Sequence, residues 1–107
     1  LFASTPGVSD LGSYTGDGVA ARVINCGFTS GARFVMIKRI DATSDWIMQD
    51  TVLGITSGAD YFTSWNVAQT GGPGTTDLIG PDSTGFTVAN NSHVNLTGGN
   101  YIYYAIA

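Results

Sequence analysis

Charged side chains are scarce in this chain, and glutamate is missing altogether. Only 11% of the 107 residues are charged, against about 25% in an average globular protein. The exposed faces of helices are usually built from Glu, Lys, Gln and Arg. Here the polar residues are mainly Gly, Ser, Thr and Asn, which favour turns. The composition therefore predicts an all-β protein with many turns and no significant helix.

Basic residues are scarcer still. The chain has four Lys and Arg residues in all and eight aspartates, which gives a net charge of −4. Proteins that bind nucleic-acid backbones normally carry a basic patch, so we expect no nucleic-acid partner. The longest apolar run is too short to cross a bilayer, and we expect no membrane insertion. A chain of this length fits a single compact domain.

Residues that carry catalytic or metal chemistry are also few. Cys26 is the one cysteine, which excludes an internal disulfide, and its position between Ile24 and Phe28 at strand spacing predicts a buried, unreactive thiol. His93 is the one histidine, and without glutamate or a second cysteine it cannot build a standard zinc site. The chain has no Gly-x-Ser-x-Gly nucleophile motif. We expect no enzymatic activity, no metal and no cofactor.

The segment Ala32–Ile40 is the one around which the other segments are organised. Its apolar run, Phe34–Ile37, suits a strand that is covered on both faces. A short polar loop follows, and then a second apolar stretch, Trp46–Met48. Strand, short polar loop and strand predict a β-hairpin.

Seven to nine short strands separated by turns are expected along the whole chain. This pattern predicts an antiparallel β-sandwich, jelly-roll-like in its topology, with a small barrel as the alternative. The last segment, Tyr101–Ala107, has apolar residues on both faces and therefore predicts an interior strand. From the alternation of the two main strands we expect four residues to be substantially buried: Phe34, Met36, Ile102 and Tyr104.

The first thirteen residues show no clear period and contain Pro6, Gly7 and Gly12. We interpret residues 1–13 as an extended lead-in from a preceding segment and residues 14–107 as a single β-sandwich domain. Four apolar side chains lie on the lead-in without an obvious core of their own, so we expect them to contact other copies in an oligomer; they are Leu1, Phe2, Val8 and Leu11. The alternative is that they fold back on their own domain.

Three aromatic residues are candidates for ligand binding: Trp46, Tyr61 and Trp65. A flat aromatic ring packs well against the C–H face of a sugar, so these side chains point to a carbohydrate ligand. The alternative is that they belong to the core, as most aromatic side chains of a small domain do.

Several motifs in a fixed order resemble a domain family that recurs in bacteriophage virion proteins. The family opens on a Y-T-G-N-G turn, carries P/A-x-F-V-x-I-K on its central strand and closes on G-G-x-Y-x-x-x-A-x-A. The matching stretches here are Gly12–Gly18, Gly27–Phe28, Ala32–Arg39, Asp45–Trp46, Gly85–Val88 and Gly98–Ala107. Asp17 stands where the family has Asn, and the insert between the Asp-Trp and Gly-Phe strands is short and rich in glycine.

Domains of this family are often found at the C-terminal end of tail-fibre-like or other appendage proteins. The resemblance implies a structural, non-enzymatic part of a tail fibre or similar appendage, located in the virion and made in the cytoplasm of the bacterial host. It implies a homotrimer whose partners are other virion proteins, with contact to the host surface as a further role. The alternatives are a carbohydrate-binding module for host surface glycan and a capsid decoration (cement) domain.

Overall fold

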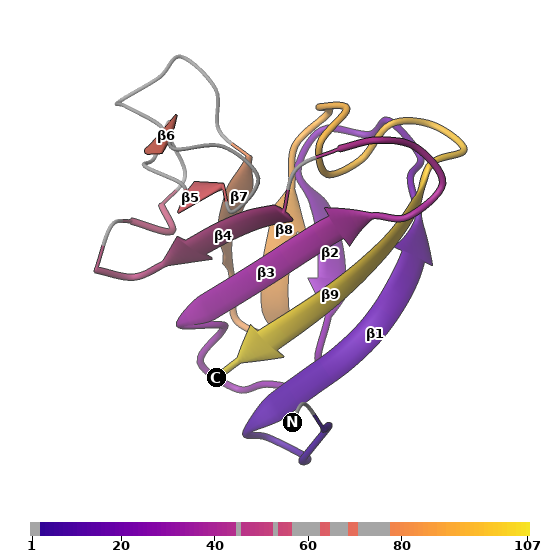
Figure 1. Ribbon diagram of the computed structural model, residues 1–107. Coiled ribbons are helices and arrows are strands. Elements are labelled where there is room, and N and C mark those ends of the chain that lie inside the picture. Colours follow the sequence, from indigo (N-terminus) through magenta and orange to yellow (C-terminus); the bar gives the residue numbers. More distant parts are fainter. Residues whose placement is uncertain (1–2, 45, 53, 57–62, 65–68, 71–77) are drawn as a thin grey trace.

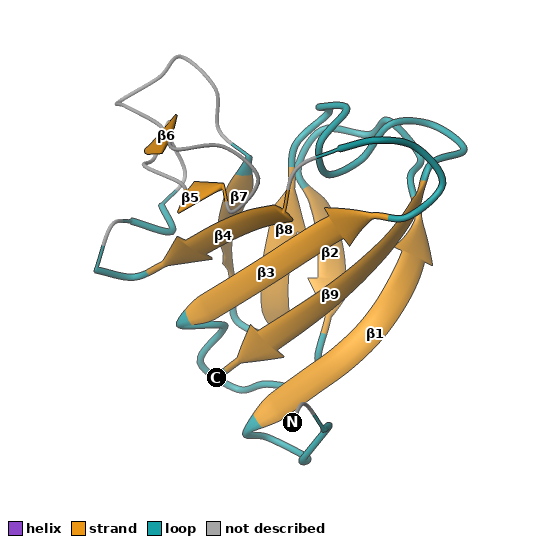
Figure 2. Ribbon diagram, in the orientation of Figure 1, coloured by secondary structure: helices purple, strands orange, loops and turns teal. Residues whose placement is uncertain are grey.

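The chain folds into two antiparallel β-sheets that pack face to face (Figure 1). The computed structural model describes residues 3–44, 46–52, 54–56, 63–64, 69–70 and 78–107. Every regular element in these ranges is a strand, and Figure 2 shows strands joined by loops without a helix. The predicted all-β sandwich is confirmed.

Nine strands lie within the described ranges, as many as the upper end of the expected number. The larger sheet has the order β1-β9-β3-β4-β5-β6 and the smaller sheet has the order β2-β8-β7. The bounds are β1 Ser9–Thr15, β2 Arg22–Asn25, β3 Phe34–Arg39, β4 Trp46–Asp50, β5 Thr63–Ser64, β6 Gln69–Thr70, β7 Ile79–Asp82, β8 Gly85–Val88 and β9 Asn100–Ile106.

Strands from the beginning of the chain pair with strands from its end. β1 pairs with β9 and β2 pairs with β8, so the first strand meets the last and the second meets the next to last. This nested pairing is jelly-roll-like. The hairpins β3–β4 and β7–β8 extend the two sheets, and β5 and β6 follow β4 in the larger one. β9 lies between β1 and β3, which confirms the interior position predicted for the last segment.

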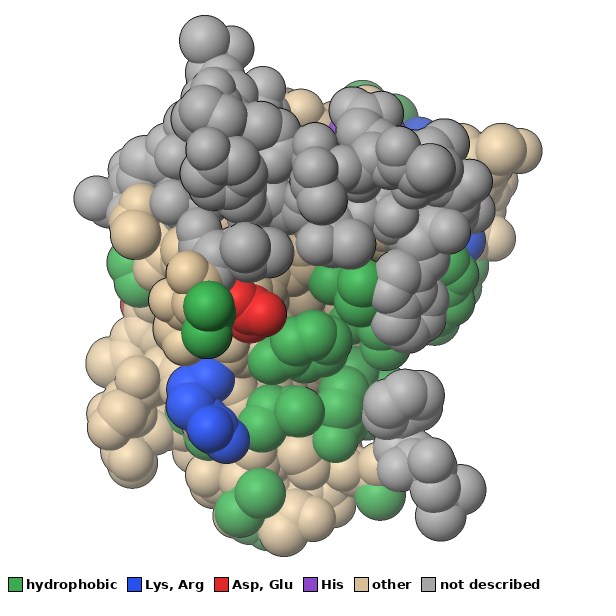
Figure 3. All heavy atoms as spheres, turned by 60° about the vertical axis from the view of Figure 1, so that its left-hand side comes forward, with side chains coloured by type: hydrophobic (Ala, Val, Ile, Leu, Met, Phe, Trp, Pro, Cys, Tyr) green, Lys and Arg blue, Asp and Glu red, His purple; other side chains and the backbone are tan. Residues whose placement is uncertain are grey.

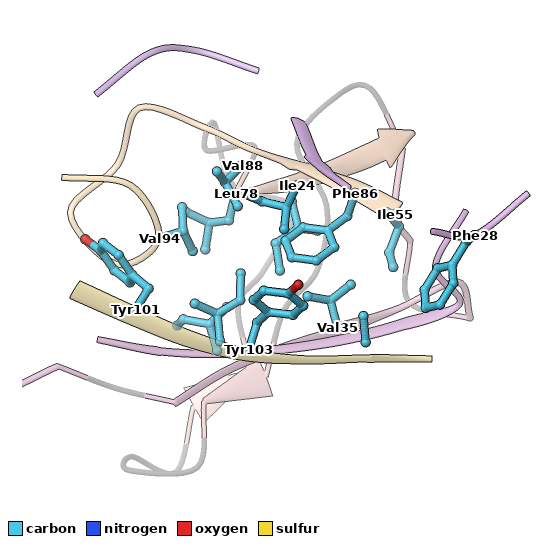
Figure 4. Packing of buried hydrophobic residues seen from close by; sticks show 14 residues of the cluster. Ile24, Phe28, Val35, Ile55, Leu78, Phe86, Val88, Val94, Tyr101 and Tyr103 are labelled. Atoms are coloured by element: carbon cyan, nitrogen blue, oxygen red, sulfur yellow. The ribbon is translucent and has the colours of Figure 1, made fainter. Parts of the chain in front are cut away.

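The core lies between the inner faces of the two sheets (Figure 4). Tyr103 of the larger sheet and Phe86 of the smaller sheet meet edge to face, with ring centroids 5.4 Å apart and ring planes at 73°, a favourable aromatic geometry. The remaining core residues are Ile24, Phe28, Val35, Ile37, Ile47, Ile55, Leu78, Ile79, Val88, Val94, Tyr101 and Ala105.

Of the four residues predicted to be substantially buried, one is buried and three are half-buried, and all four lie on the outer face of the larger sheet. Phe34, Ile102 and Tyr104 are half-buried and lie on the outer face of the larger sheet. Met36 is buried as predicted, with 5% of its surface exposed, but it too lies on the outer face. Both alternations of these strands are apolar, so the period alone could not tell which one points inward.

The predicted boundary at residue 14 also needs correction, because β1 begins at Ser9 and pairs with β9 along its whole length. Among the described residues, 3–8 precede it, and they turn back along its edge. Thr5 forms a bridge with Ser9, and the hydroxyl of Ser4 accepts a hydrogen bond from the amide of Leu11 over 2.9 Å. Residues 9–13 are therefore part of the domain rather than a lead-in to it.

Gly12 allows β1 to lie close against the core side of β9. A Cβ atom at Gly12 would be 2.6 Å from the hydroxyl oxygen of Tyr103, so the buried Tyr103 ring would have to shift to admit a side chain. The same hydroxyl donates a hydrogen bond to Asp10. The absence of a side chain at Gly12 thus sets the position of β1, and with it the position of its outward-facing residues.

Candidate interaction surface

The larger sheet is apolar on both of its faces, and its outer face is the main candidate for function. On β9, Tyr101, Tyr103 and Ala105 enter the core. The residues between them, Ile102, Tyr104 and Ile106, face the other way because successive side chains of a strand alternate between the two faces.

The register of the four long strands aligns these outward-facing side chains in three rows across the sheet. We list each row in the order β1, β9, β3, β4. The first flanking row is Ser13, Ile102, Lys38 and Trp46, and the middle row is Leu11, Tyr104, Met36 and Met48. The second flanking row is Ser9, Ile106, Phe34 and Asp50. We refer to the eight apolar members, Leu11, Phe34, Met36, Trp46, Met48, Ile102, Tyr104 and Ile106, as the outer-face cluster. The middle row consists of apolar residues only.

Most members of the outer-face cluster remain accessible to solvent. Leu11 has 47% of its surface exposed, and all the others except Met36 are half-buried. Between them lies a shallow hollow of about 120 Å³, which is lined by Leu11, Met36, Trp46, Ile102, Tyr103 and Tyr104. Monomeric soluble proteins seldom expose contiguous apolar patches larger than a few hundred Å², and larger ones mark interaction sites.

Two members of the three rows are charged, and Arg33, which precedes Phe34, lies at the same end of the hairpin as Asp50. Lys38 belongs to one flanking row and Asp50 to the other, so the middle row separates them. The amine of Lys38 donates a hydrogen bond to the carbonyl oxygen of Ser44, and the carboxylate of Asp50 accepts one from the amide of Val52 over 3.0 Å. In the turned space-filling view, hydrophobic side chains gather beside acidic and basic groups (Figure 3).

Two of the residues predicted to bind ligands or other copies belong to the outer-face cluster, and one lies beside it. Trp46 is at the start of β4 and is half-buried. Leu11 is on β1, and Val8, just before this strand, has 57% of its surface exposed. The other four predicted site residues lie outside the described residues: Leu1, Phe2, Tyr61 and Trp65.

The one cysteine and the one histidine of the chain lie among the described residues. Cys26 is free and half-buried, and burial, together with the nearby Asp10 carboxylate, raises the pKa of its thiol to about 12, so the reactive thiolate is rare at neutral pH. His93 lies with its Nδ1 atom 3.4 Å from the hydroxyl of Ser44. In the described part of the chain, no three His, Cys, Asp or Glu side chains gather to hold a metal ion.

A family comparison matches residues 1–107 to a family described as "Domain of unknown function (DUF7483)". The chain belongs to this family. Searches of the curated proteins and of the solved structures found no match. Within the described ranges this DUF7483 chain has no helix long and apolar enough to cross a membrane.

Sequence reasoning named only Leu11 and Trp46 among the eight members of the DUF7483 outer-face cluster. It expected Phe34, Ile102 and Tyr104 to be substantially buried, without assigning them to either face of the sheet. The signal that could have identified them was present, because β3 and β9 are apolar in both alternations. Such a strand has to be covered on both faces, and a domain with only two layers covers one face of each sheet. In a two-layer domain the second face of such a strand lies outside the core between the sheets.

Proposed function

We propose that this chain is a structural, non-enzymatic domain of a tailed-bacteriophage virion, part of a tail fibre or similar appendage, which works by binding other protein surfaces, including copies of itself. The observation that carries this proposal is the outer-face cluster. The resemblance to virion appendage domains supplies the biological setting, and the cluster supplies a physical means of assembly.

The energetics favour association through this face. Burying one Leu, Ile, Phe or Met side chain against a neighbour contributes roughly 1.5–3 kcal/mol. Several such side chains on one face, repeated by symmetry, would outweigh the entropy that association costs, which is about 4–15 kcal/mol. With charged residues at only 11%, the domain also has few of the groups that keep protein surfaces apart.

The motifs that carry the resemblance coincide with this sheet. Gly12–Gly18 overlaps β1, Ala32–Arg39 contains β3, and Gly98–Ala107 contains β9. These three strands are neighbours in the larger sheet and supply six of the eight members of the outer-face cluster. The resemblance and the candidate surface therefore involve the same part of the molecule.

Two measurements test the proposal. Sedimentation of the wild-type chain at micromolar concentration should show an oligomer, and the resemblance makes a trimer the expected state. Electron microscopy of phage particles labelled with antibody against the chain should place it on the tail or an appendage. Labelling of the capsid would favour the decoration domain instead, and particles without label would contradict a virion protein.

Carbohydrate binding is a second candidate, because Trp46 lines the outer hollow together with Tyr104. A sugar ring stacked on Trp46 would change its fluorescence. The Trp65→Phe variant isolates this signal, and titration with host surface polysaccharide should shift its emission if this function holds. Unchanged emission at millimolar glycan would rule out a sugar at this position.

A further inference from the structure

We propose that a hollow between the edges of the two sheets binds a guanidinium group, and that the carboxylate of Asp10 recognises it. β1 is the first strand in the order of the larger sheet and β2 is the first in the order of the smaller one, and both lie on the same side of the sandwich (Figure 1). The inference uses neither the outer-face cluster nor self-association, so it is independent of the proposed function.

The hollow lies between the beginning of β1 and the residues that follow β2, and the turn of residues 3–8 forms a further wall. Its volume is about 290 Å³, close to the lower limit of about 300 Å³ for small-molecule sites. A Cβ atom at Gly7 or at Gly27 would meet nothing within 4 Å, so both glycines border open space. Asp10 is the one charged residue among the described residues that line the hollow.

Asp10 forms no ion pair within the described part of the chain. Its Oδ2 atom accepts a hydrogen bond from the hydroxyl of Tyr103, and the hydroxyl of Ser4 lies 3.5 Å from its Oδ1 atom. Both donors are neutral. An ionised carboxylate has about four acceptor positions, so Asp10 retains capacity for a charged donor that enters the hollow.

The chain itself has no basic side chain left for Asp10. Each of its four Lys and Arg residues has a partner at another position, either an aspartate or a main-chain carbonyl oxygen. The pairs are Arg22 with Asp17, Arg33 with Ala107, Lys38 with Ser44, and Arg39 with Asp41. A cation that pairs with Asp10 would therefore come from outside this chain.

The other half of the same edge indicates which cation fits. The guanidinium of Arg22, on β2, donates a hydrogen bond to the carbonyl oxygen of Thr15 and lies 5.3 Å from the centroid of the Tyr14 ring. Its Nε atom is 3.4 Å from the carboxylate of Asp17. One planar cation thus bridges the two edge strands through hydrogen bonds, a ring contact and charge. A guanidinium in the hollow would bridge them in the same way, and its fork of donors matches a carboxylate better than an ammonium does.

Titration followed by ¹H–¹⁵N NMR tests the site. Ethylguanidinium should shift the amide signals of Gly7 and Gly27 saturably, and in the millimolar range because an ion pair at a solvent-accessible site is weak. Ethylurea, a neutral molecule of similar shape, should bind about tenfold more weakly or less, because charge-assisted hydrogen bonds are the stronger ones. Signals that do not saturate with ethylguanidinium, or equal binding of ethylurea, would overturn the proposal.

A third probe, N-acetylarginine amide, distinguishes the two sources of a guanidinium. Tighter binding of this probe than of ethylguanidinium supports an arginine side chain of another protein as the ligand. Tighter binding of ethylguanidinium supports a free small molecule.

Asp10→Asn tests the role of the carboxylate, because it removes the charge and keeps an acceptor oxygen for Tyr103. It should weaken binding of ethylguanidinium about tenfold or more. Asp41→Asn is the matched control, since it removes the same charge at the opposite end of β9 from a carboxylate that already pairs with Arg39. It should bind as wild type does. Unchanged binding by Asp10→Asn, or equal weakening in both variants, would contradict recognition by Asp10.

A second pair of variants replaces this test if Asp10→Asn does not give the dispersed NMR spectrum of a folded chain. Pro6 lines the hollow at an exposed turn position, so Pro6→Arg supplies a guanidinium from the chain itself. It should weaken binding of ethylguanidinium relative to Pro6→Gln, which makes the same backbone change without the charge. Equal binding by the two variants would count against the site.

Discussion

The outer faces of the two sheets differ sharply in character. The larger sheet presents the outer-face cluster, whereas the smaller sheet presents side chains that are small or polar apart from one valine: Val23, Asn25, Gly80, Asp82, Gly85 and Thr87. The polar groups there are already used locally, since Asn25 accepts a hydrogen bond from Gly27 and Asp82 accepts two from Thr84. The outer face of the smaller sheet is thus small or polar with its polar groups hydrogen-bonded locally, whereas the outer face of the larger sheet is mostly apolar.

From this contrast we expect association through the outer face of the larger sheet and not through that of the smaller sheet. Two layers bury one face of each sheet, and the composition of the remaining face then decides whether the domain is complete by itself. The predictions below begin with the core that both sheets share and proceed to the features in which they differ.

The largest effect is expected for Phe86→Ala, which removes a fully buried ring from the middle of the sandwich. Loss of this ring costs about 3–5 kcal/mol of unfolding free energy, and urea denaturation would measure it. Because both sheets contribute to this core, the difference between their outer faces should not affect the unfolding free energy of this variant. A loss below about 1 kcal/mol would contradict the packing of Phe86 against Tyr103.

The two faces of β1 should respond differently to alanine. Gly12→Ala places a Cβ against the Tyr103 ring and should cost about 1–3 kcal/mol, as measured by chemical denaturation. Ser13→Ala is the matched control on the outer face of the same strand, at an exposed position, and should stay within about 0.5 kcal/mol of wild type. Equal effects for both variants would contradict the close approach of Gly12 to the Tyr103 ring, and a larger effect for Ser13→Ala would mean that the inner and outer faces of β1 are exchanged.

A pair of exposed residues compares the two outer faces directly. Leu11 on the larger sheet and Val23 on the smaller sheet have nearly the same exposed fraction, 47% and 48%. Leu11→Asn should weaken self-association about tenfold or more, because the side chain would lose its burial against another copy. Val23→Asn should leave association unchanged. Sedimentation equilibrium measures both, and equal weakening would remove the distinction between the faces.

The smallest effect concerns the turn between β7 and β8. Hydrogen bonds from the hydroxyl and the amide of Thr84 hold the pKa of Asp82 below its ordinary value of 3.8. A carboxyl whose pKa is lowered by folding contributes stability above its unfolded pKa and loses this contribution as the pH falls through its folded pKa. Unfolding measured between pH 7 and pH 2 should therefore show an acid loss that is reduced in Asp82→Asn. An identical acid profile in both proteins would exclude this contribution.

The sequence was sufficient to predict the hairpin of β3 and β4 and the interior position of β9. In both cases a continuous apolar segment adjoins clear turn residues, and such a segment can form few structures other than an interior strand. It was not sufficient to orient them. Val35 and Met36 are equally apolar, so the choice of the inward one depends on which strands of the other sheet lie opposite, and this is a property of the tertiary fold.

β1 was missed for a different reason. Asp10 and Gly12 face inward on this strand, where a sequence pattern would require apolar residues. Asp10 is accommodated because Tyr103 donates a hydrogen bond to it, and Gly12 is required because the Tyr103 ring fills its space. Both effects come from Tyr103, which is about ninety positions away in the sequence, so a local sequence pattern cannot predict them. For the same reason only Leu11 of this strand was placed in the candidate site.

The turn formed by residues 3–8 limits the ways in which an assembly of these chains could grow. Ser4 and Thr5 occupy the backbone groups of Leu11 and Ser9 on the open side of β1, so a strand from another chain cannot pair with this first half of the edge. Growth of one continuous sheet from chain to chain is hindered there. Contact through faces related by a rotation axis, in contrast, stops when the ring is complete, and the result is a particle of fixed size rather than a fibril.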